Sequence, residues 1–255
     1  MQIKVLGCYG AELPGFKTSC FMLNDSTLID AGAVTSILTP HEQRGIRDIL
    51  VTHSHLDHIK DIPLLADNII GSNPGRINVI SSGEVIAILK EHLFNNSIWP
   101  DFSKIPTPEN PVINFKEIEV GKPFQINGTT VTAIKLNHVV PTLGYIFTEN
   151  GSSVAILGDT RDTEEIWQAL SKTDNLKGIF IETSFPDSMV ELAQLSGHLT
   201  PKMLASELGK LKGKADTCIY VYHMKPNYLD TLKEEIRAIK NSNISILELN
   251  QTFIF

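Results

Sequence analysis

Four side chains that bind metal ions well are packed into one short stretch, VTHSHLDH at residues 51–58. They are His53, His55, Asp57 and His58. The residues before them, DILVT at 48–52, have the apolar composition of a buried strand. Side chains two apart in an extended segment point the same way, so His53 and His55 can meet one metal ion. Asp57 and His58 are expected in the turn that leads to the next helix, where they can reach a second ion.

Three more ligand-type residues stand where an apolar strand pattern ends. His138 follows the run TTVTAIKL, Asp159 follows SVAILG, and His223 follows TCIYVY. Imidazole and carboxylate groups are typical zinc ligands, and a catalytic site leaves one position open for water. Because the same arrangement occurs four times along the chain, the pattern predicts a metal centre with ligands from several strand ends.

The elements that must position these ligands are short β-rich runs with helical patterns between them. Strands are expected at 3–7, 20–24, 27–32, 48–52, 129–136, 143–147, 153–159, 178–182, 217–222 and 244–249. Helices are expected at 62–70, 83–93, 162–172, 201–211 and 229–240, and the proline-rich stretch 99–111 is expected to be irregular. Two strand-rich halves with helices outside predict an α/β fold, an αββα sandwich of two facing mixed β-sheets. No linker divides the sequence, so residues 1–255 are expected to form one domain.

The composition disfavours some classes of partner. The 255 residues include 22 Lys and Arg against 29 Asp and Glu, a formal net charge of -7. A large nucleic acid is therefore not expected, because its phosphates are usually met by a basic face. No apolar stretch approaches the length of a membrane span, and the amino terminus lacks the apolar core of a signal peptide. Three scattered cysteines suit a reducing compartment, which predicts a soluble cytoplasmic protein.

The motifs LIDAG at 28–32, THSHLDH at 52–58, His138, GDT at 158–160 and His223 resemble the metallo-β-lactamase superfamily in type and order. This resemblance implies the αββα sandwich and two Zn²⁺ ions per chain, with Mn²⁺ or Fe²⁺ as alternatives. It implies that His53, His55 and His138 bind the first ion. Asp57, His58 and His223 would bind the second, and Asp159 would bridge both together with a hydroxide.

Within that superfamily, HSHLDHI at 53–59, TSCF at 18–21, ETSF at 182–185 and HMKP at 223–226 resemble the class II 3′,5′-cyclic-nucleotide phosphodiesterases. The chain departs from their pattern at Asp61, where glycine is common. The resemblance implies hydrolysis of cAMP or cGMP to nucleoside 5′-monophosphates by attack of the metal-bridging hydroxide. Asp57 and Asp159 would take part in catalysis as well as in metal binding.

A further catalytic candidate is His198 in SGHLTP at 196–201. Thr200 is expected to cap a helix that has Pro201 at its first position, so His198 lies just before the helix. By resemblance to related phosphodiesterases, His198 would donate a proton to the leaving 3′ oxygen. Two carboxylates are expected to support the site. Asp30 in LIDAG resembles the family's buried aspartate and would orient a metal-binding histidine, and Glu182 would hold His198.

Two other functions remain open from the sequence. Ribonuclease Z, an RNA 3′ endonuclease, shares the metal ligands and the His198 type of segment, but no stretch here resembles its projecting basic arm. A lactone or thioester hydrolase, or a β-lactamase, would share the metals without needing His198. The expected partner is a small cyclic nucleotide and not a membrane; a homodimer is left open.

Overall fold

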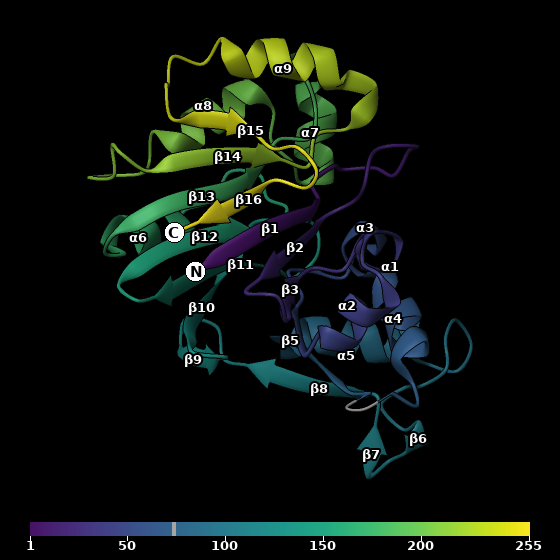
Figure 1. Cartoon of the computed structure of the whole chain (residues 1–255). Helices are drawn as coiled ribbons and strands as arrows, with labels where there is room; N and C mark the ends of the chain where they lie inside the picture. The colour runs from purple at the N-terminus through teal and green to yellow at the C-terminus, as the bar shows by residue number, and fades with distance from the viewer. Residues whose placement is uncertain (73–74) are drawn as a thin grey trace.

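The first of two facing sheets contains the amino-terminal strand and the strand that leads into residues 53–58 (Figure 1). The computed structural model describes residues 1–72 and 75–255. The strand order in this seven-stranded sheet is β16 (Thr252–Ile254), β1 (Gln2–Gly7), β2 (Cys20–Leu23), β3 (Thr27–Ile29), β4 (Asp48–Leu50), β5 (Ile77–Ser82) and β8 (Ile113–Ile118). Strands from β16 to β3 pair antiparallel, and those from β3 to β8 pair parallel, so the sheet is mixed.

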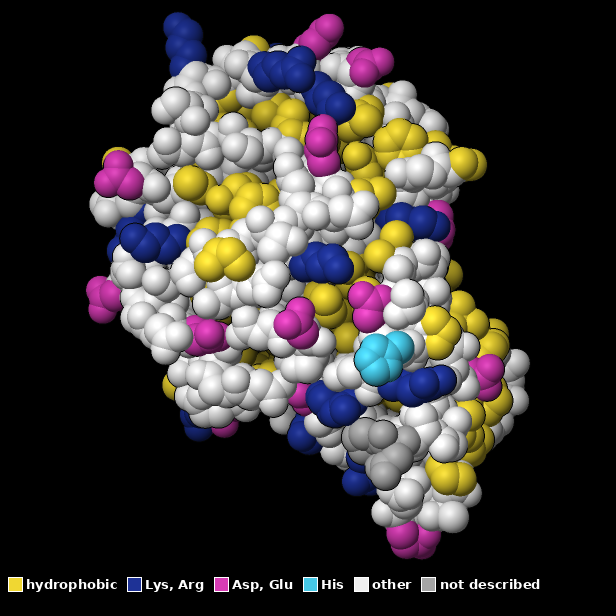
Figure 2. Space-filling model, in the orientation of Figure 1, with side chains coloured by type: hydrophobic (Ala, Val, Ile, Leu, Met, Phe, Trp, Pro, Cys, Tyr) yellow, Lys and Arg dark blue, Asp and Glu magenta, His cyan; other side chains and the backbone are white. Residues whose placement is uncertain are grey.

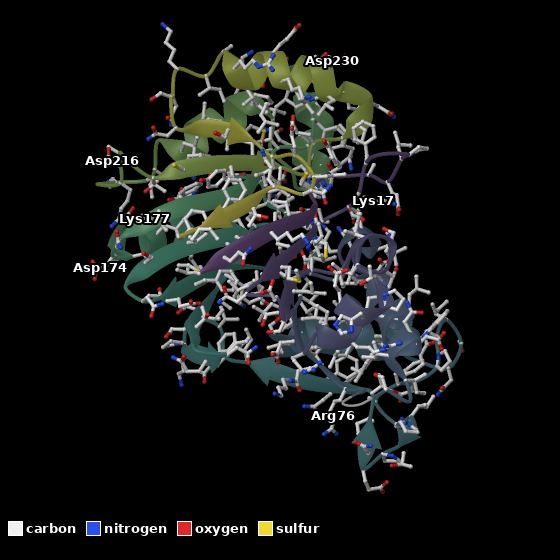
Figure 3. All side chains as sticks on the ribbon, viewed as in Figure 1. Lys17, Arg76, Asp174, Lys177, Asp216 and Asp230 are labelled. Atoms are coloured by element: carbon white, nitrogen blue, oxygen red, sulfur yellow. The ribbon has the colours of Figure 1, made fainter. Side chains whose placement is uncertain are left out.

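The second sheet is also seven-stranded and mixed. Its order is β15 (Ile244–Ile246), β14 (Cys218–Tyr222), β13 (Leu176–Glu182), β12 (Ser152–Leu157), β11 (Thr142–Glu149), β10 (Thr129–Leu136) and β9 (Pro123–Ile126). The strands from β9 to β12 are antiparallel, and those from β12 to β15 are parallel. Asp174, Lys177 and Asp216, labelled in Figure 3, mark the amino ends of β13 and β14.

Helices cover the outer face of each sheet (Figure 1). On the first sheet they are α1 (Val34–Ile37), α2 (Pro40–Gly45), α3 (Leu56–Ile59), α4 (Asp61–Ile69) and α5 (Gly83–Ile88), which continues as a π-helix over Leu89–Leu93. On the second sheet they are α6 (Glu165–Lys172), α7 (Val190–Ser196), α8 (Pro201–Leu208) and α9 (Leu229–Arg237). Short 3-10 turns lie at Asp187–Met189 and Pro226–Tyr228. A two-stranded hairpin, β6 (Pro106–Thr107) and β7 (Asn110–Pro111), stands apart from both sheets.

Three apolar layers hold these four layers of structure together. Alternate residues of one strand enter different layers, because successive side chains in a strand point to opposite faces. In β2, Phe21 packs between the two sheets, whereas Met22 packs under the helices. The layer between the sheets also contains Tyr145, Phe147 and Phe180 from the second sheet, all fully buried. The predicted αββα sandwich of two mixed sheets is confirmed.

The predicted elements agree with the structure in most places. Strands β1, β2, β3, β4, β10, β11, β12, β13, β14 and β15 lie where the sequence indicated them. Strands β5, β8 and β16 and helices α1, α2, α3 and α7 were not predicted. The helical pattern over 83–93 changes to a π-helix at Leu89. The stretch 99–111 is largely irregular as expected, apart from β6 and β7. That residues 1–255 form one domain stays a prediction.

Asp61, which replaces the expected glycine, has a structural use at the start of α4. Its buried carboxylate accepts hydrogen bonds from the backbone N–H of Thr35 at 2.8 Å and from the Thr35 hydroxyl at 2.7 Å. Lys60 Nζ donates to its other oxygen at 2.9 Å. An acidic residue in the first turn also suits the positive end of the helix dipole. Asp61 therefore ties α4 to α1 and leaves the neighbouring metal-ligand candidates in place.

The surface carries both signs of charge. On the face drawn in Figure 2, lysine and arginine side chains alternate with acidic ones over both halves of the molecule. Within the described residues, no helix has the length and apolar character needed to cross a bilayer.

Candidate metal centre

The seven predicted metal ligands converge at one edge of the sandwich, where strands of both sheets end. His53 and His55 follow β4, and Asp57 and His58 lie in α3. His138, Asp159 and His223 follow β10, β12 and β14 of the second sheet. The prediction that Asp57 and His58 occupy a turn is wrong: a one-turn helix begins directly after His55, and its winding brings Asp57 and His58 toward the second sheet.

The candidate ligand atoms form three groups, of which the third shares Asp159 with the first and His223 with the second. One atom from each of His53, His55, His138 and Asp159 lies within 4.8 Å of the others. The same holds for Asp57, His58 and His223, and for a third set of Asp159, His198 and His223. The two ligand sets that the resemblance implied are therefore brought together in space.

Asp159 lies between the two groups. One carboxylate oxygen, Oδ2, is 3.6 Å from His53 Nε2. The other, Oδ1, is 3.4 Å from His58 Nε2 and 3.5 Å from His223 Nε2. The side chain is 1% exposed, so water does not screen these contacts. A carboxylate with one oxygen toward each group has the geometry of a bridging ligand.

Two buried atoms of this cluster have no hydrogen-bond partner among the described residues. They are His53 Nε2 and Asp159 Oδ1. Burying a polar atom without a partner costs about 1–3 kcal/mol, and more for a charged group. A divalent cation would satisfy a histidine nitrogen and a carboxylate oxygen at once, so the residues present fit a metal ion.

Burial keeps three of the histidines in the form that binds metals. It lowers the pKa of His53 well below its ordinary value and lowers the pKa of His55 and His138 as well. These rings are neutral at pH 7, and a neutral imidazole has the lone pair that a metal needs.

In His58 and Asp57, by contrast, the neighbouring charges favour the ionised form of the side chain. Burial opposes the charged form of His58, but the carboxylates of Asp159 and Asp30 outweigh it and raise the His58 pKa well above its ordinary value. Burial also opposes ionisation of Asp57, but His223 and His58 overcome it and hold the Asp57 pKa well below its usual range. The carboxylates of Asp57 and Asp159 therefore stay ionised and favour a positive charge beside them, carried by protonated His58 or by a bound cation.

The ring nitrogens that face away from the centre are held by neighbouring groups. His58 Nδ1 lies 2.6 Å from Asp30 Oδ2, and Asp30 also accepts hydrogen bonds from the Thr52 N–H and hydroxyl, each at 2.8 Å. His138 Nδ1 lies 2.8 Å from the Gly197 carbonyl oxygen. Such partners fix the orientation and tautomer of a metal-binding ring. Asp30 thus lies where its predicted orienting role requires.

The backbone takes uncommon conformations at this edge. Asp30 has φ of 57° and His223 has φ of 64°, a left-handed region in which residues other than glycine are uncommon. Gly197 has φ of 79°, and a Cβ atom there would lie 2.6 Å from His138 Nδ1. Only glycine satisfies both conditions at residue 197 without strain. Sequence reasoning did not identify Gly197, although it lies within the SGHLTP segment.

His198 lies beside the centre and is held by Glu182. His198 Nδ1 is 2.9 Å from Glu182 Oε1 and 3.9 Å from Asp159 Oδ2. Glu182 is fully buried and also accepts hydrogen bonds from the N–H groups of Thr160 and Leu199. Burial opposes protonation of His198, but Glu182 outweighs it and raises the His198 pKa above its ordinary value. Because Nδ1 is engaged, Nε2 is the nitrogen left for a substrate.

The segment after His198 is formed as predicted. The Thr200 hydroxyl accepts a hydrogen bond from the Met203 N–H, and Pro201 is the first residue of α8.

Ser184 connects the two sides of the site and was missed by sequence reasoning. Its hydroxyl donates to Glu182 Oε2 at 2.8 Å. The same oxygen lies 2.9 Å from His223 Nδ1 and 3.2 Å from His198 Nδ1. Ser184 therefore joins a candidate metal ligand to the carboxylate that holds His198. The only signal for it in the sequence was its place in ETSF.

The family model and the curated relatives that match this sequence are all cyclic-nucleotide phosphodiesterases in the cases that follow. The family model of the class-II cAMP phosphodiesterases matches residues 31–249. A probable 3′,5′-cyclic-nucleotide phosphodiesterase of Yersinia pestis is 24% identical over 89% of this chain and 79% of its own length. The 3′,5′-cyclic-nucleotide phosphodiesterase 1 of Saccharomyces cerevisiae is 29% identical over 77% of this chain. The matched region spans 62% of that yeast protein's length.

Solved structures share the fold. Unliganded yeast PDE1 superposes with a TM-score of 0.82 at 21% identity and covers 98% of both chains. The metallo-β-lactamase fold protein YhfI of Bacillus subtilis gives a TM-score of 0.76 at 16% identity, over 99% of this chain and 98% of its own. With the family model matched over most of its length, this chain belongs to the class-II cAMP phosphodiesterase family and has the metallo-β-lactamase fold.

Proposed function

We propose that this protein hydrolyses 3′,5′-cyclic nucleotides, cAMP and cGMP, to nucleoside 5′-monophosphates. It does so with two divalent metal ions per chain, principally Zn²⁺, with Mn²⁺ or Fe²⁺ as alternatives. The observation that carries the proposal is His198, held by Glu182 at 2.9 Å and lying beside Asp159 at the ligand cluster. A proton donor in that place is needed for an alkoxide leaving group such as the 3′ oxygen. Thioester hydrolysis would not need it, because a thiolate leaves without a proton.

The two ligand groups would each hold one ion. His53, His55 and His138 would bind the first, and Asp57, His58 and His223 the second, with Asp159 shared. When bound, such ions polarise the phosphoryl oxygens and lower the pKa of water to about 7, which supplies the nucleophile. The proposed roles of the two aspartates are to hold the ions and to offset part of their positive charge.

His198 would act at the leaving group. The water oxygen forms a new bond to phosphorus, and the bond from phosphorus to the 3′ oxygen breaks. The 3′ oxygen takes a proton from His198 Nε2, while Glu182 keeps Nδ1 engaged and stabilises the ring's positive charge before transfer. No covalent enzyme intermediate is needed. Neither Ser19 nor Cys20, whose side chains are buried, has to act as a nucleophile.

The direct test of the function is an assay of purified, metal-loaded protein on 3′,5′-cAMP, 3′,5′-cGMP, 2′,3′-cAMP and a transfer-RNA precursor. We expect 5′-AMP and 5′-GMP from the first two, identified by chromatography. Cleavage of the RNA precursor without turnover of either 3′,5′-cyclic nucleotide would contradict the proposal and favour a ribonuclease Z activity.

Asp159→Ala is expected to weaken both metal ions at once, because its two oxygens face different ligand groups. His138→Ala should chiefly weaken the first ion. Elemental analysis after dialysis measures the metal content, expected to be about two ions in the unaltered protein. Asp174→Ala, just before the amino end of β13 (Figure 3), is the control and should keep both ions, because the candidate ligands follow the carboxyl ends of the strands. Two retained ions in Asp159→Ala would refute the shared role of Asp159.

His198→Ala is expected to lower kcat on cAMP by about 10²–10⁴-fold, the usual contribution of general acid catalysis. The metal content should not change. The loss should be smaller on an analogue with sulfur in place of the 3′ oxygen, because a thiolate leaves without a proton. The exposed His92→Ala is the matched control. An equal loss on both substrates would assign His198 to phosphate binding instead.

Ser184→Ala is expected to weaken metal binding by about 10- to 100-fold, as removal of a group that holds a metal-binding ring usually does. Chelator competition measures this affinity. Ser184→Thr keeps the hydroxyl and should restore most of it, whereas Ser171→Ala, distant from the cluster, should change nothing. If Ser184→Ala binds metal as tightly as the unaltered protein, Ser184 does not position His223.

A further inference from the structure

A cleft adjoins the metal centre on the side of His138. It has a volume of about 330 Å³ and lies between the carboxyl end of β5 with the start of α5 and the connection from β10 to β11. Glu84 lines it from α5 and Lys135 from β10. Val139, Val140 and Pro141 line it from the connection. We call this space, with these five residues and His138, the nucleoside cleft.

The nucleoside cleft shares His138 with the candidate metal centre. His138 lines the cleft, and its Nε2 lies 3.3 Å from His55 Nδ1 at the cluster. The Leu143 N–H donates to the Thr52 carbonyl oxygen at 3.0 Å, which fixes the start of β11, directly after the β10–β11 connection, against the residue before His53. A phosphate at the cluster would therefore have the cleft beside it, within reach of the remainder of the same small molecule.

We infer that the nucleoside cleft binds the nucleoside of the substrate, with the base against the valines and proline and its edge toward Glu84 and Lys135. This inference rests on the proposed function. The volume is at the lower end of the range for small-molecule sites, which suits one nucleoside and not a longer nucleic acid.

The two charged side chains offer what a purine edge needs. A carboxylate accepts hydrogen bonds, and an ammonium donates them. Adenine presents an amino donor beside a ring-nitrogen acceptor, and guanine presents N–H donors beside a carbonyl acceptor. Proteins read such edges by hydrogen bonds while apolar side chains cover the base face. Glu84 with Lys135 thus complements either purine, and the cleft is predicted to accept both cAMP and cGMP.

The test compares nucleotide and non-nucleotide diesters. Steady-state kinetics are measured for the metal-loaded protein, Glu84→Ala and Lys135→Ala on cAMP, cGMP and bis(4-nitrophenyl) phosphate. Each variant should raise KM for the cyclic nucleotides by about 5-fold, the worth of one exposed hydrogen bond. The kcat values and the rates on bis(4-nitrophenyl) phosphate should stay within about twofold. The matched controls are Glu119→Ala and Lys122→Ala, which form an exposed ion pair with each other outside the cleft.

A binding measurement separates the cleft from the reaction. In protein labelled at the valine methyl groups, adenosine, which has no phosphate, should shift the NMR signals of Val139 and Val140. No shift at saturating adenosine would overturn the inference. Equal losses of Glu84→Ala on nucleotides and on bis(4-nitrophenyl) phosphate would overturn it as well. If the protein cleaves only bis(4-nitrophenyl) phosphate, the proposed function fails, and the adenosine shifts still decide for or against the cleft.

Discussion

The buried carboxylate of Asp159 sets the main physical constraint on this molecule. It is 1% exposed and lies 3.4–3.6 Å from the Nε2 atoms of His53, His58 and His223. A buried charge is costly unless another charge or a metal compensates it. Protonated His58 can compensate part of that charge, but His53 is held neutral by burial. A cation on each side of Asp159 would satisfy the carboxylate and the histidine lone pairs together, and the rest of the site is arranged to keep these atoms in place.

Both sheets contribute to that arrangement. The histidines of the first sheet reach the centre from β4 and α3, and the second sheet supplies its ligands where β10, β12 and β14 end. Asp30 and His223 each follow the last residue of a strand and have left-handed backbone conformations. This conformation turns the chain out of the strand direction at the point where their side chains meet the site. Strain of this kind persists only when the surroundings fix it. Here Asp30 is fixed by three hydrogen bonds from Thr52 and His58.

The hydroxyl of Ser184 connects a proposed metal ligand with the carboxylate that holds the proposed proton donor. Its bonds to Glu182 and its approach to His223 place the proposed proton donor and a proposed metal ligand in one buried hydrogen-bonded network. Glu182 has four partners in this network and none of them is solvent-exposed. The position of His198 relative to Asp159 is thereby fixed before a substrate arrives, as preorganised catalysis requires.

Five of the seven metal-ligand candidates, His53, His55, His138, Asp159 and His223, were predictable because they follow the ends of apolar strands, a signal that is local in the sequence. The helix that holds Asp57 and His58 was not, because a single turn of four residues has no periodic pattern.

Helix α7 was missed for a similar reason: Ala193 is its only fully buried residue, while Leu192 and Leu195 are exposed. Strand β8 has one fully buried residue, Ile113, while Lys116 and Glu117 are exposed, so its apolar signal is weak. Ser184 and Gly197 act through contacts with His223 and His138, which are 39 and 59 residues away along the chain. Only the folded structure brings these partners together.

The most direct test of a centre shared through Asp159 is anomalous diffraction from crystals of the metal-loaded protein at the absorption edge of the bound metal. Two peaks are predicted about 3.5–4 Å apart, one among His53, His55 and His138 and one among Asp57, His58 and His223. Asp159 should lie between the two peaks. A single peak, or a peak coordinated by His198, would contradict this account of the centre.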